Sequence, residues 1–134
     1  MNIAENVNFR SGGFGADANG IGNGGLIEIN ASNLTLVSSG LGADANSSGE
    51  GGTIDLNLTN NLVINDGGIG ADSNDTGSGG NIEIDAQNID VDGGGFGVDS
   101  RNVGEGGDLT IRATDINIAN GAIGADSSLS LIHI

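Results

Sequence analysis

The chain has 134 residues, 27 of them glycine, and contains no proline, cysteine, tryptophan or tyrosine. Its 18 acidic and 3 basic residues give a formal net charge of −15, which argues against nucleic acid or an anionic membrane surface as a partner, because both require a basic protein surface. The lack of cysteine excludes disulfides and thiolate metal sites, and no stretch approaches the roughly 18 apolar residues of a membrane-spanning helix.

The first predicted element is a short strand that recurs through the chain. Its apolar first and third positions have period two, which indicates one buried face. The copies are Val7-Asn8-Phe9, Leu34-Thr35-Leu36, Leu62-Val63-Ile64, Ile89-Asp90-Val91 and Ile116-Asn117-Ile118. The residue before each copy is Asn6, Asn33, Asn61, Asn88 or Asp115. We interpret the asparagines as structural, because Asn accepts left-handed turns and forms hydrogen-bonded ladders between stacked strands.

The second predicted element is an apolar residue followed by Gly, a small apolar residue and Asp. It occurs as Phe14-Gly15-Ala16-Asp17, Leu41-Gly42-Ala43-Asp44, Ile69-Gly70-Ala71-Asp72, Phe96-Gly97-Val98-Asp99 and Ile123-Gly124-Ala125-Asp126. The first residues of these motifs are separated by 27, 28, 27 and 27 residues. The one extra residue falls around Thr59 to Asn61, and we expect a surface turn there to absorb it.

The third predicted element follows a glycine pair that begins ten residues after the first residue of each of the first four motifs. The pairs are Gly24-Gly25, Gly51-Gly52, Gly79-Gly80 and Gly106-Gly107. The alternating segments that they introduce read Ile27-Glu28-Ile29-Asn30-Ala31, Ile54-Asp55-Leu56-Asn57-Leu58, Ile82-Glu83-Ile84-Asp85-Ala86 and Leu109-Thr110-Ile111-Arg112-Ala113. Each repeat therefore supplies three strands, which we expect to be about 3 to 5 residues long.

The repeat predicts an all-β fold, a single parallel β-helix (β-solenoid) with three short strands per coil of 27 to 28 residues. Like residues recur at each inward position, as stacking of equivalent positions about 4.8 Å apart requires. A β-propeller blade needs four strands and a longer period. We expect the apolar residue at each strand position named above to point inward, including all three phenylalanines, Phe9, Phe14 and Phe96.

The aspartates Asp17, Asp44, Asp72, Asp99 and Asp126 should form an outward row of stacked carboxylates. Such carboxylates repel one another by about 1 kcal/mol per pair in water, so something should relieve the repulsion. One hypothesis is a row of Ca²⁺ ions. The other, which we favour because no second acidic ligand is aligned, is that each Asp accepts a hydrogen bond from its own turn and that no metal binds.

A related hypothesis is a calcium-stabilised β-roll-like secreted module. The segments 12–17 and 94–99 match the first six positions of the Ca²⁺-binding nonapeptide G-G-x-G-x-D-x-U-x. The match ends there, because Asn19 and Arg101 occupy the apolar U position and the nonapeptides are not in tandem.

A fragment of a β-helical polysaccharide lyase or hydrolase is the third hypothesis, since glycoside hydrolysis needs two carboxylates and carboxylates are abundant. Every acidic residue belongs to the repeat, however, whereas an active site breaks the symmetry. The chain has no lysine, and its one histidine, His133, lies outside the repeat. We therefore predict no enzyme activity and no catalytic residues.

The motifs also resemble those of a known family. A glycine pair followed by I-x-I-x-A and N-L-T-L, as in residues 24–36 and 79–91, is similar to the repeats of filamentous haemagglutinin-like exoproteins, notably cyanobacterial ones. The resemblance covers nearly all of residues 6–128. It implies a right-handed β-helical shaft, export by two-partner secretion and a place at the surface of a Gram-negative bacterium. It also implies adhesion or aggregation through a receptor bound by other regions of a larger protein.

We divide the chain into a β-helix segment, 1–128, and an aberrant tail, 129–134. The segment holds about four and a half coils and is expected to be truncated at both ends, because Met1 falls in mid-repeat. The sequence from Ser128 to Ile134 resembles translated sequencing-adapter read-through, and we exclude it from the predicted fold. A capping strand is the alternative.

Overall fold

The computed structural model describes residues 5–101, 104–124 and 128–133, the last of these as backbone. The described residues form ten strands and no helix long and apolar enough to cross a membrane. The strands are β1 (Asn6–Arg10), β2 (Gly13–Gly15), β3 (Leu26–Val37), β4 (Gly40–Gly42), β5 (Thr53–Gly70), β6 (Asn81–Asp85), β7 (Asn88–Gly97), β8 (Asp108–Ala113), β9 (Asp115–Gly124) and β10 (Ser128–His133).

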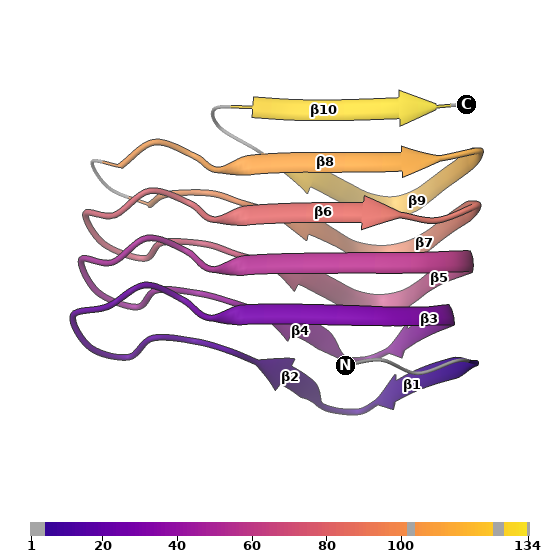
Figure 1. Cartoon of the computed structure of the whole chain (residues 1–134), viewed down its shortest axis with the longest axis horizontal. Coiled ribbons are helices and arrows are strands. Elements are labelled where there is room, and N and C mark those ends of the chain that lie inside the picture. The colour runs from indigo at the N-terminus through magenta and orange to yellow at the C-terminus, as the bar shows by residue number, and fades with distance from the viewer. Residues whose placement is uncertain (1–4, 102–103, 125–127, 134) are drawn as a thin grey trace.

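The strands stack in parallel, each on the equivalent strand of the next coil (Figure 1). Ile27 pairs with Ile54, and Ile54 with Ile82, so the register places like residues on like. On the other faces Asn33 lies between Asn6 and Asn61 in the same way. This register confirms the predicted β-solenoid and its period.

Several strands are longer than predicted, because the backbone stays extended through corners. The alternating segment after the glycine pair and the short strand that follows it join in β3, and these two and the start of the next Gly-small-Asp motif join in the 18 residues of β5. The corner before the Gly-small-Asp motif contains a residue with a left-handed backbone in every described coil, and in one coil the next two residues, Gly94 and Gly95, also have positive φ. The φ of the first residue lies between 47° and 77° at the equivalent positions Ser11, Ser38, Asp66, Gly93 and Asn120.

The extra residue of the 28-residue coil lies at a corner, as predicted. Ala31 pairs with Leu58, and Asn33 pairs with Asn61. The first strand thus advances by two residues where its partner advances by three. Pairing on both sides of this shift remains in register, with Ile27 on Ile54 and Leu34 on Leu62. The insertion therefore changes one corner and leaves the flanking strands aligned.

The core consists of the predicted inward rows, which are buried in the middle coils. Phe14 differs, because its side chain is 42% exposed. It lies in the first described coil, where no described strand pairs with the other edge of β2, and so it is covered on one side only. Phe14 points to the same side as its paired residue Leu41, as predicted, and its exposure reflects its place at the end of the described stack.

Small residues on both sides of each aspartate point inward, and the row that follows the aspartates was missing from the prediction. Ala43, Ala71 and Val98 have no exposed surface, and two positions further on Ala45 and Ser73 are also fully buried. Parallel bridges join Ala18, Ala45, Ser73 and Ser100 in register. The period-two alternation thus continues past the Asp into the loop, a signal already present in the recurring small residues.

The glycine pairs close each coil across its width. The backbone N–H of Gly52 donates to the carbonyl of Ala43 at 2.5 Å, and Gly80 bonds to Ala71 at 2.6 Å in the same way. A Cβ on Gly51 would overlap the carbonyl oxygen of Ala71. Only glycine therefore fits at this close approach of two backbone segments, which we call the glycine neck, and this explains why the pairs recur.

The tail excluded from the prediction adds a strand to the stack. The backbone of Ser128–His133 forms β10, which pairs in parallel with all six residues of β8. In Figure 1, β10 lies above β8 at the C-terminal end of the stack. The described stack thus extends past the predicted boundary at residue 128.

Candidate functional site

The most regular polar feature is the predicted row of aspartates. The backbone N–H of each aspartate donates to Oδ1 of the aspartate in the preceding coil, from Asp44 to Asp17 at 3.1 Å, from Asp72 to Asp44 at 2.9 Å and from Asp99 to Asp72 at 2.9 Å. Asp126 lies outside the described residues. The first three carboxylates therefore accept hydrogen bonds from the backbone of the next coil. We had expected them to accept hydrogen bonds from their own turns.

Opposing effects act on the carboxylates of this row, and at Asp44 those that disfavour the charged form prevail. Burial is the main cause that raises the pKa of Asp44 above its ordinary value, and the charges of Asp72 and Asp17 act in the same direction. The N–H of Asp72 and the charge of Arg101 oppose the increase. Backbone donors thus offset part of the repulsion for which a cation was considered.

No metal centre is evident in the part of the chain that the structure describes. Within it, no group of three or more His, Cys, Asp or Glu side chains is arranged to hold a metal ion. Of the two segments that resemble the Ca²⁺-binding nonapeptide, 12–17 contains β2, and 94–99 begins in β7 and ends two residues after it. They therefore occupy different coils and do not form successive turns.

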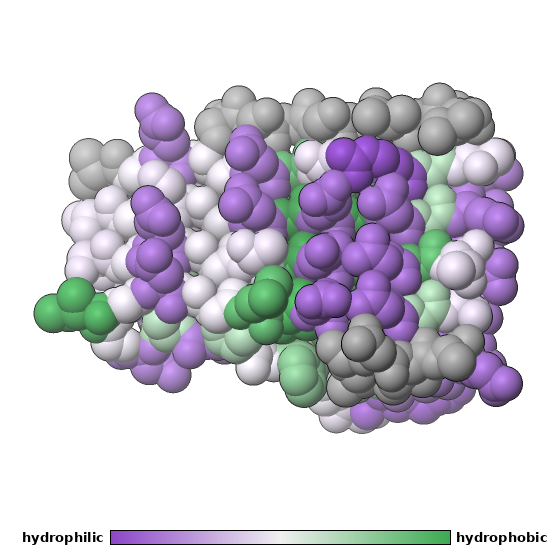
Figure 2. Space-filling model, viewed as in Figure 1, coloured by the Kyte–Doolittle hydropathy of each residue, from purple (hydrophilic) through white to green (hydrophobic). Residues whose placement is uncertain are grey.

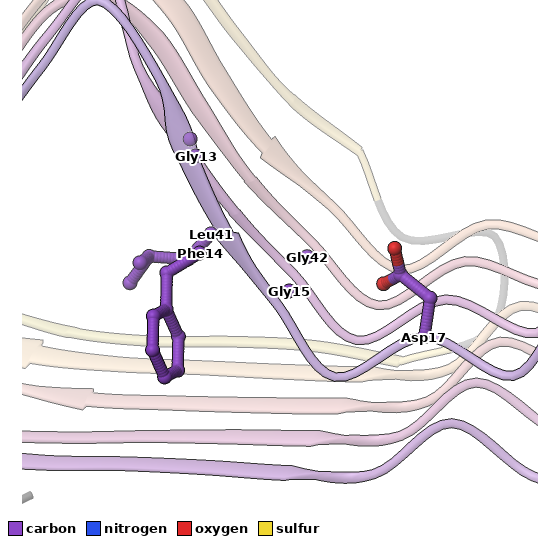
Figure 3. A pocket seen from close by; sticks show the side chains of 7 residues that line it. Gly13, Phe14, Gly15, Asp17, Leu41 and Gly42 are labelled. Carbon is purple, nitrogen blue, oxygen red and sulfur yellow. The ribbon is translucent and has the colours of Figure 1, made fainter.

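An open hollow lies beside the start of the aspartate row (Figure 3). Phe14 and Leu41 line it from paired positions of β2 and β4, and Asp17 stands at its edge. Figure 3 shows the two apolar side chains on one side of the backbone and the Asp17 carboxylate directed away from them. A single carboxylate beside an apolar surface lacks the second acid that glycoside hydrolysis requires.

The predicted asparagine row forms a continuous ladder. The side-chain Nδ2 of Asn33 donates to Oδ1 of Asn6 at 2.7 Å, Asn61 donates to Asn33 at 2.9 Å, and Asn88 donates to Asn61 at 2.9 Å. Every donor points toward the N-terminal coil. The structural interpretation of these asparagines agrees with this geometry.

A second asparagine ladder was not predicted. Asn46 donates to Asn19 at 3.0 Å, and Asn74 donates to Asn46 at 2.7 Å. The equivalent position in the next coil is Arg101, and Oδ1 of Asn74 is buried without a hydrogen-bond partner. The ladder stops at the coil in which the repeat has Arg in place of Asn. The 27- to 28-residue spacing of these asparagines in the sequence could have predicted the ladder.

The outward face of β3, β5, β6 and β8 is acidic, and Figure 2 shows its hydrophilic side chains in columns along the stack. Glu28, Asp55 and Glu83 occupy paired positions. Burial and then the charges of Glu83 and Glu28 raise the pKa of Asp55. Arg112 forms ion pairs with Glu83 and Asp85, at 3.3 Å to the latter, and the hydrogen bond that it donates to Glu83 is the main cause that raises the pKa of Arg112.

No protein-family model matches this chain, and neither a curated protein nor a solved structure matches it. The resemblance to filamentous haemagglutinin-like exoproteins rests on the repeat motifs and on no other likeness.

Proposed function

We propose that this chain is a structural segment of the shaft of a large secreted or surface-attached bacterial adhesin, without catalytic activity. The observation that supports this role most is the uniformity of the coils. Among the described residues, the inward rows, the glycine necks and the aspartate row recur from coil to coil. A shaft needs such uniformity, because each coil supports the next.

The neighbours of these coils in this proposal are further coils of the same parent protein. The receptor is bound by other regions, because the described residues offer repeated polar ladders and open hollows in place of one distinct pocket. Secretion and a place at the surface of a Gram-negative bacterium are part of the proposal through the resemblance of the repeat motifs. The net charge of −15 makes nucleic acid an unsuitable partner.

Surface labelling tests this role directly. Antibodies raised against the purified chain should label intact, unpermeabilised cells of the bacterium that produces it. Labelling only after permeabilisation would contradict an extracellular shaft. In parallel, the purified chain should release no reducing ends or unsaturated sugars from acidic polysaccharides. Release of either would support a β-helical polysaccharide lyase or hydrolase instead.

A calcium-stabilised module is the second candidate, favoured by the row Asp17, Asp44, Asp72 and Asp99. Thermal melts in Ca²⁺ and in EDTA distinguish it from a metal-free shaft. The hydrogen bonds that already occupy Oδ1 of the first three aspartates predict equal melting temperatures in the two buffers. A higher melting temperature in Ca²⁺ than in Mg²⁺ at equal ionic strength would support the calcium module.

A further inference from the structure

Asn-Gly is the dipeptide most prone to spontaneous deamidation, and it occurs three times among the described residues. The pairs are Asn19-Gly20, Asn23-Gly24 and Asn120-Gly121. In this reaction the backbone nitrogen of the glycine attacks Cγ of the asparagine side chain, and the side-chain nitrogen leaves as ammonia. Glycine favours the attack, because it has no Cβ to obstruct the approach. The folded backbone holds the three glycines in different ways, so the three asparagines should differ in reactivity.

The pair Asn23-Gly24 is held by the glycine neck. The N–H of Gly24 donates to the carbonyl of Glu50 at 2.9 Å. A Cβ on Gly24 would lie 2.3 Å from the carbonyl oxygen of Ala43, so the backbone at this point is closely packed. The nitrogen that would attack is thus bound to the next coil and has no room to turn toward the side chain of Asn23.

The pair Asn120-Gly121 is held by strand pairing at the left-handed corner of β9. Gly121 pairs in register with Gly94 of β7, and a Cβ on Gly121 would lie 2.7 Å from the carbonyl oxygen of Gly94. Nδ2 of Asn120 donates to Oδ1 of Asp92 at 2.9 Å. Both the attacking backbone and the amide that would leave are therefore restrained.

The pair Asn19-Gly20 lies in the loop between β2 and β3, where the backbone has room to turn. Both residues are exposed, a Cβ on Gly20 would meet no atom within 4 Å, and the N–H of Gly20 makes no backbone hydrogen bond to a described residue. Ser47 is the equivalent of Gly20 in the next coil. Its N–H likewise makes no backbone hydrogen bond to a described residue, although this coil has a described coil on either side. The freedom of this nitrogen is therefore a property of the loop and not of the first coil.

The side-chain carbonyl of Asn19 is polarised for the attack by the second asparagine ladder. Nδ2 of Asn46 donates to Oδ1 of Asn19 at 3.0 Å, so a donor faces the oxygen on which negative charge develops as Cγ is attacked. Asn23 has a comparable donor, because the N–H of Glu50 donates to its Oδ1 at 3.0 Å. The two asparagines thus share a polarised carbonyl and differ in the freedom of the glycine that follows.

From these features we propose that Asn19 is a site of spontaneous deamidation in the folded protein, whereas Asn23 and Asn120 are protected. The backbone nitrogen of Gly20 loses its proton and bonds to Cγ of Asn19, and Nδ2 leaves as ammonia. Water then opens the cyclic imide at either carbonyl and gives aspartate or isoaspartate at this position. The aspartate product adds a negative charge and keeps an oxygen that can accept from Asn46. The modification needs only water and does not depend on the proposed adhesin role.

Mass spectrometry of the incubated full-length chain tests this selectivity. Proteolysis after Glu5 and Glu28 places Asn19 and Asn23 in one peptide, so fragmentation compares the two directly. In the native chain Asn19 should convert several-fold faster than Asn23 or Asn120. In urea the three rates should converge, because the neck and the strands no longer hold the glycines. Equal rates in the native chain, or no conversion at Asn19, would overturn the proposal.

The variant Gly20→Ala tests the reaction at its attacking residue. A Cβ there has open space, so the fold should be unaffected, whereas the added methyl group obstructs ring closure. Gly22→Ala is the matched control, because its Cβ also meets no atom within 4 Å but Gly22 follows Ile21 and not an asparagine. Deamidation of Asn19 should slow several-fold in Gly20→Ala and stay unchanged in Gly22→Ala, while circular dichroism of both retains the β spectrum. No slowing in Gly20→Ala, or equal slowing in both variants, would overturn the proposal.

Discussion

The backbone N–H of Asp72 donates a hydrogen bond of 2.9 Å to Oδ1 of Asp44 in the preceding coil. This bond favours the charged carboxylate, yet burial and the charges of Asp72 and Asp17 outweigh it and raise the pKa of Asp44. The folded protein therefore binds a proton at Asp44 more tightly than the unfolded chain does. The same relation holds for Asp55, whose pKa is also raised.

Stability should consequently increase as the pH falls. The penalty at Asp44 and Asp55 is fully present above their folded-state pKa values and disappears as the pH approaches the ordinary value of 3.8. The melting temperature should rise as the pH falls through the folded-state pKa values toward 3.8. The variant Asp44→Asn, which retains an Oδ1 acceptor for Asp72, should melt higher at pH 7 and respond less to pH. A steady fall in melting temperature over this range would contradict the prediction.

Replacing Arg101 by Asn should stabilise the protein. The new Nδ2 could donate to the buried Oδ1 of Asn74, which has no partner, and extend the ladder by one coil. A satisfied buried acceptor is worth about 1 kcal/mol in the free energy of unfolding, measured by urea denaturation. Arg101→Ala is the matched control, because it removes the same side chain without supplying a donor. Equal effects of the two substitutions would exclude the ladder as the cause.

At the left-handed corner, glycine should give a more stable protein than alanine. Ser38 is exposed and has φ of 47°, so Ser38→Gly should exceed Ser38→Ala in stability by about 1 kcal/mol. At Asn65, which is exposed in β5 and is not among the positive-φ residues, the order should reverse. Urea denaturation of the four variants checks both orders. The same order at both sites would show that backbone strain is not responsible.

Breaking the first asparagine ladder in its middle should cost more than removing an amide that bonds within its own coil. Asn61 donates to Asn33 and accepts from Asn88, so Asn61→Ala removes two side-chain bonds between coils, at about 1 kcal/mol each. Asn57→Ala is the control, since Asn57 bonds only to Asp55 two residues away among its side-chain contacts. Thermal unfolding should rank Asn61→Ala as the less stable variant. Equal melting temperatures would mean that the ladder adds no stability between coils.

Much of the fold follows from the sequence, because period-two alternation at a fixed spacing leaves few ways to bury Ile54, Leu62 and Ile69 together. The left-handed corner was less predictable, since serine, aspartate, glycine and asparagine all occupy it and no one residue type marks it. The exposure of Phe14 depends on its place at an end of the stack, which residue type does not encode.

The sequence predicted where the aspartates of the candidate site lie, but it did not predict their hydrogen-bond partners. Spacing placed the aspartates in a row, but it did not reveal that their acceptor atoms face the backbone of the next coil. Directions of hydrogen bonds depend on the corner geometry, which period and residue type leave open. Only the structure shows that Oδ1 of Asn74 is buried without a hydrogen-bond partner. The sequence shows only that Arg101 replaces Asn at the next equivalent position.

The corner between Leu58 and Asn61 accommodates an added residue while the strands on either side keep their partners. The length of a corner can therefore change without altering the stacking of the strands along the axis. A peptide grafted at the same corner of successive coils would be displayed at intervals of about 4.8 Å along a straight edge. The stacking of the backbone would thus set the spacing of the displayed groups, and the sequence of the inserted peptide would set their chemistry.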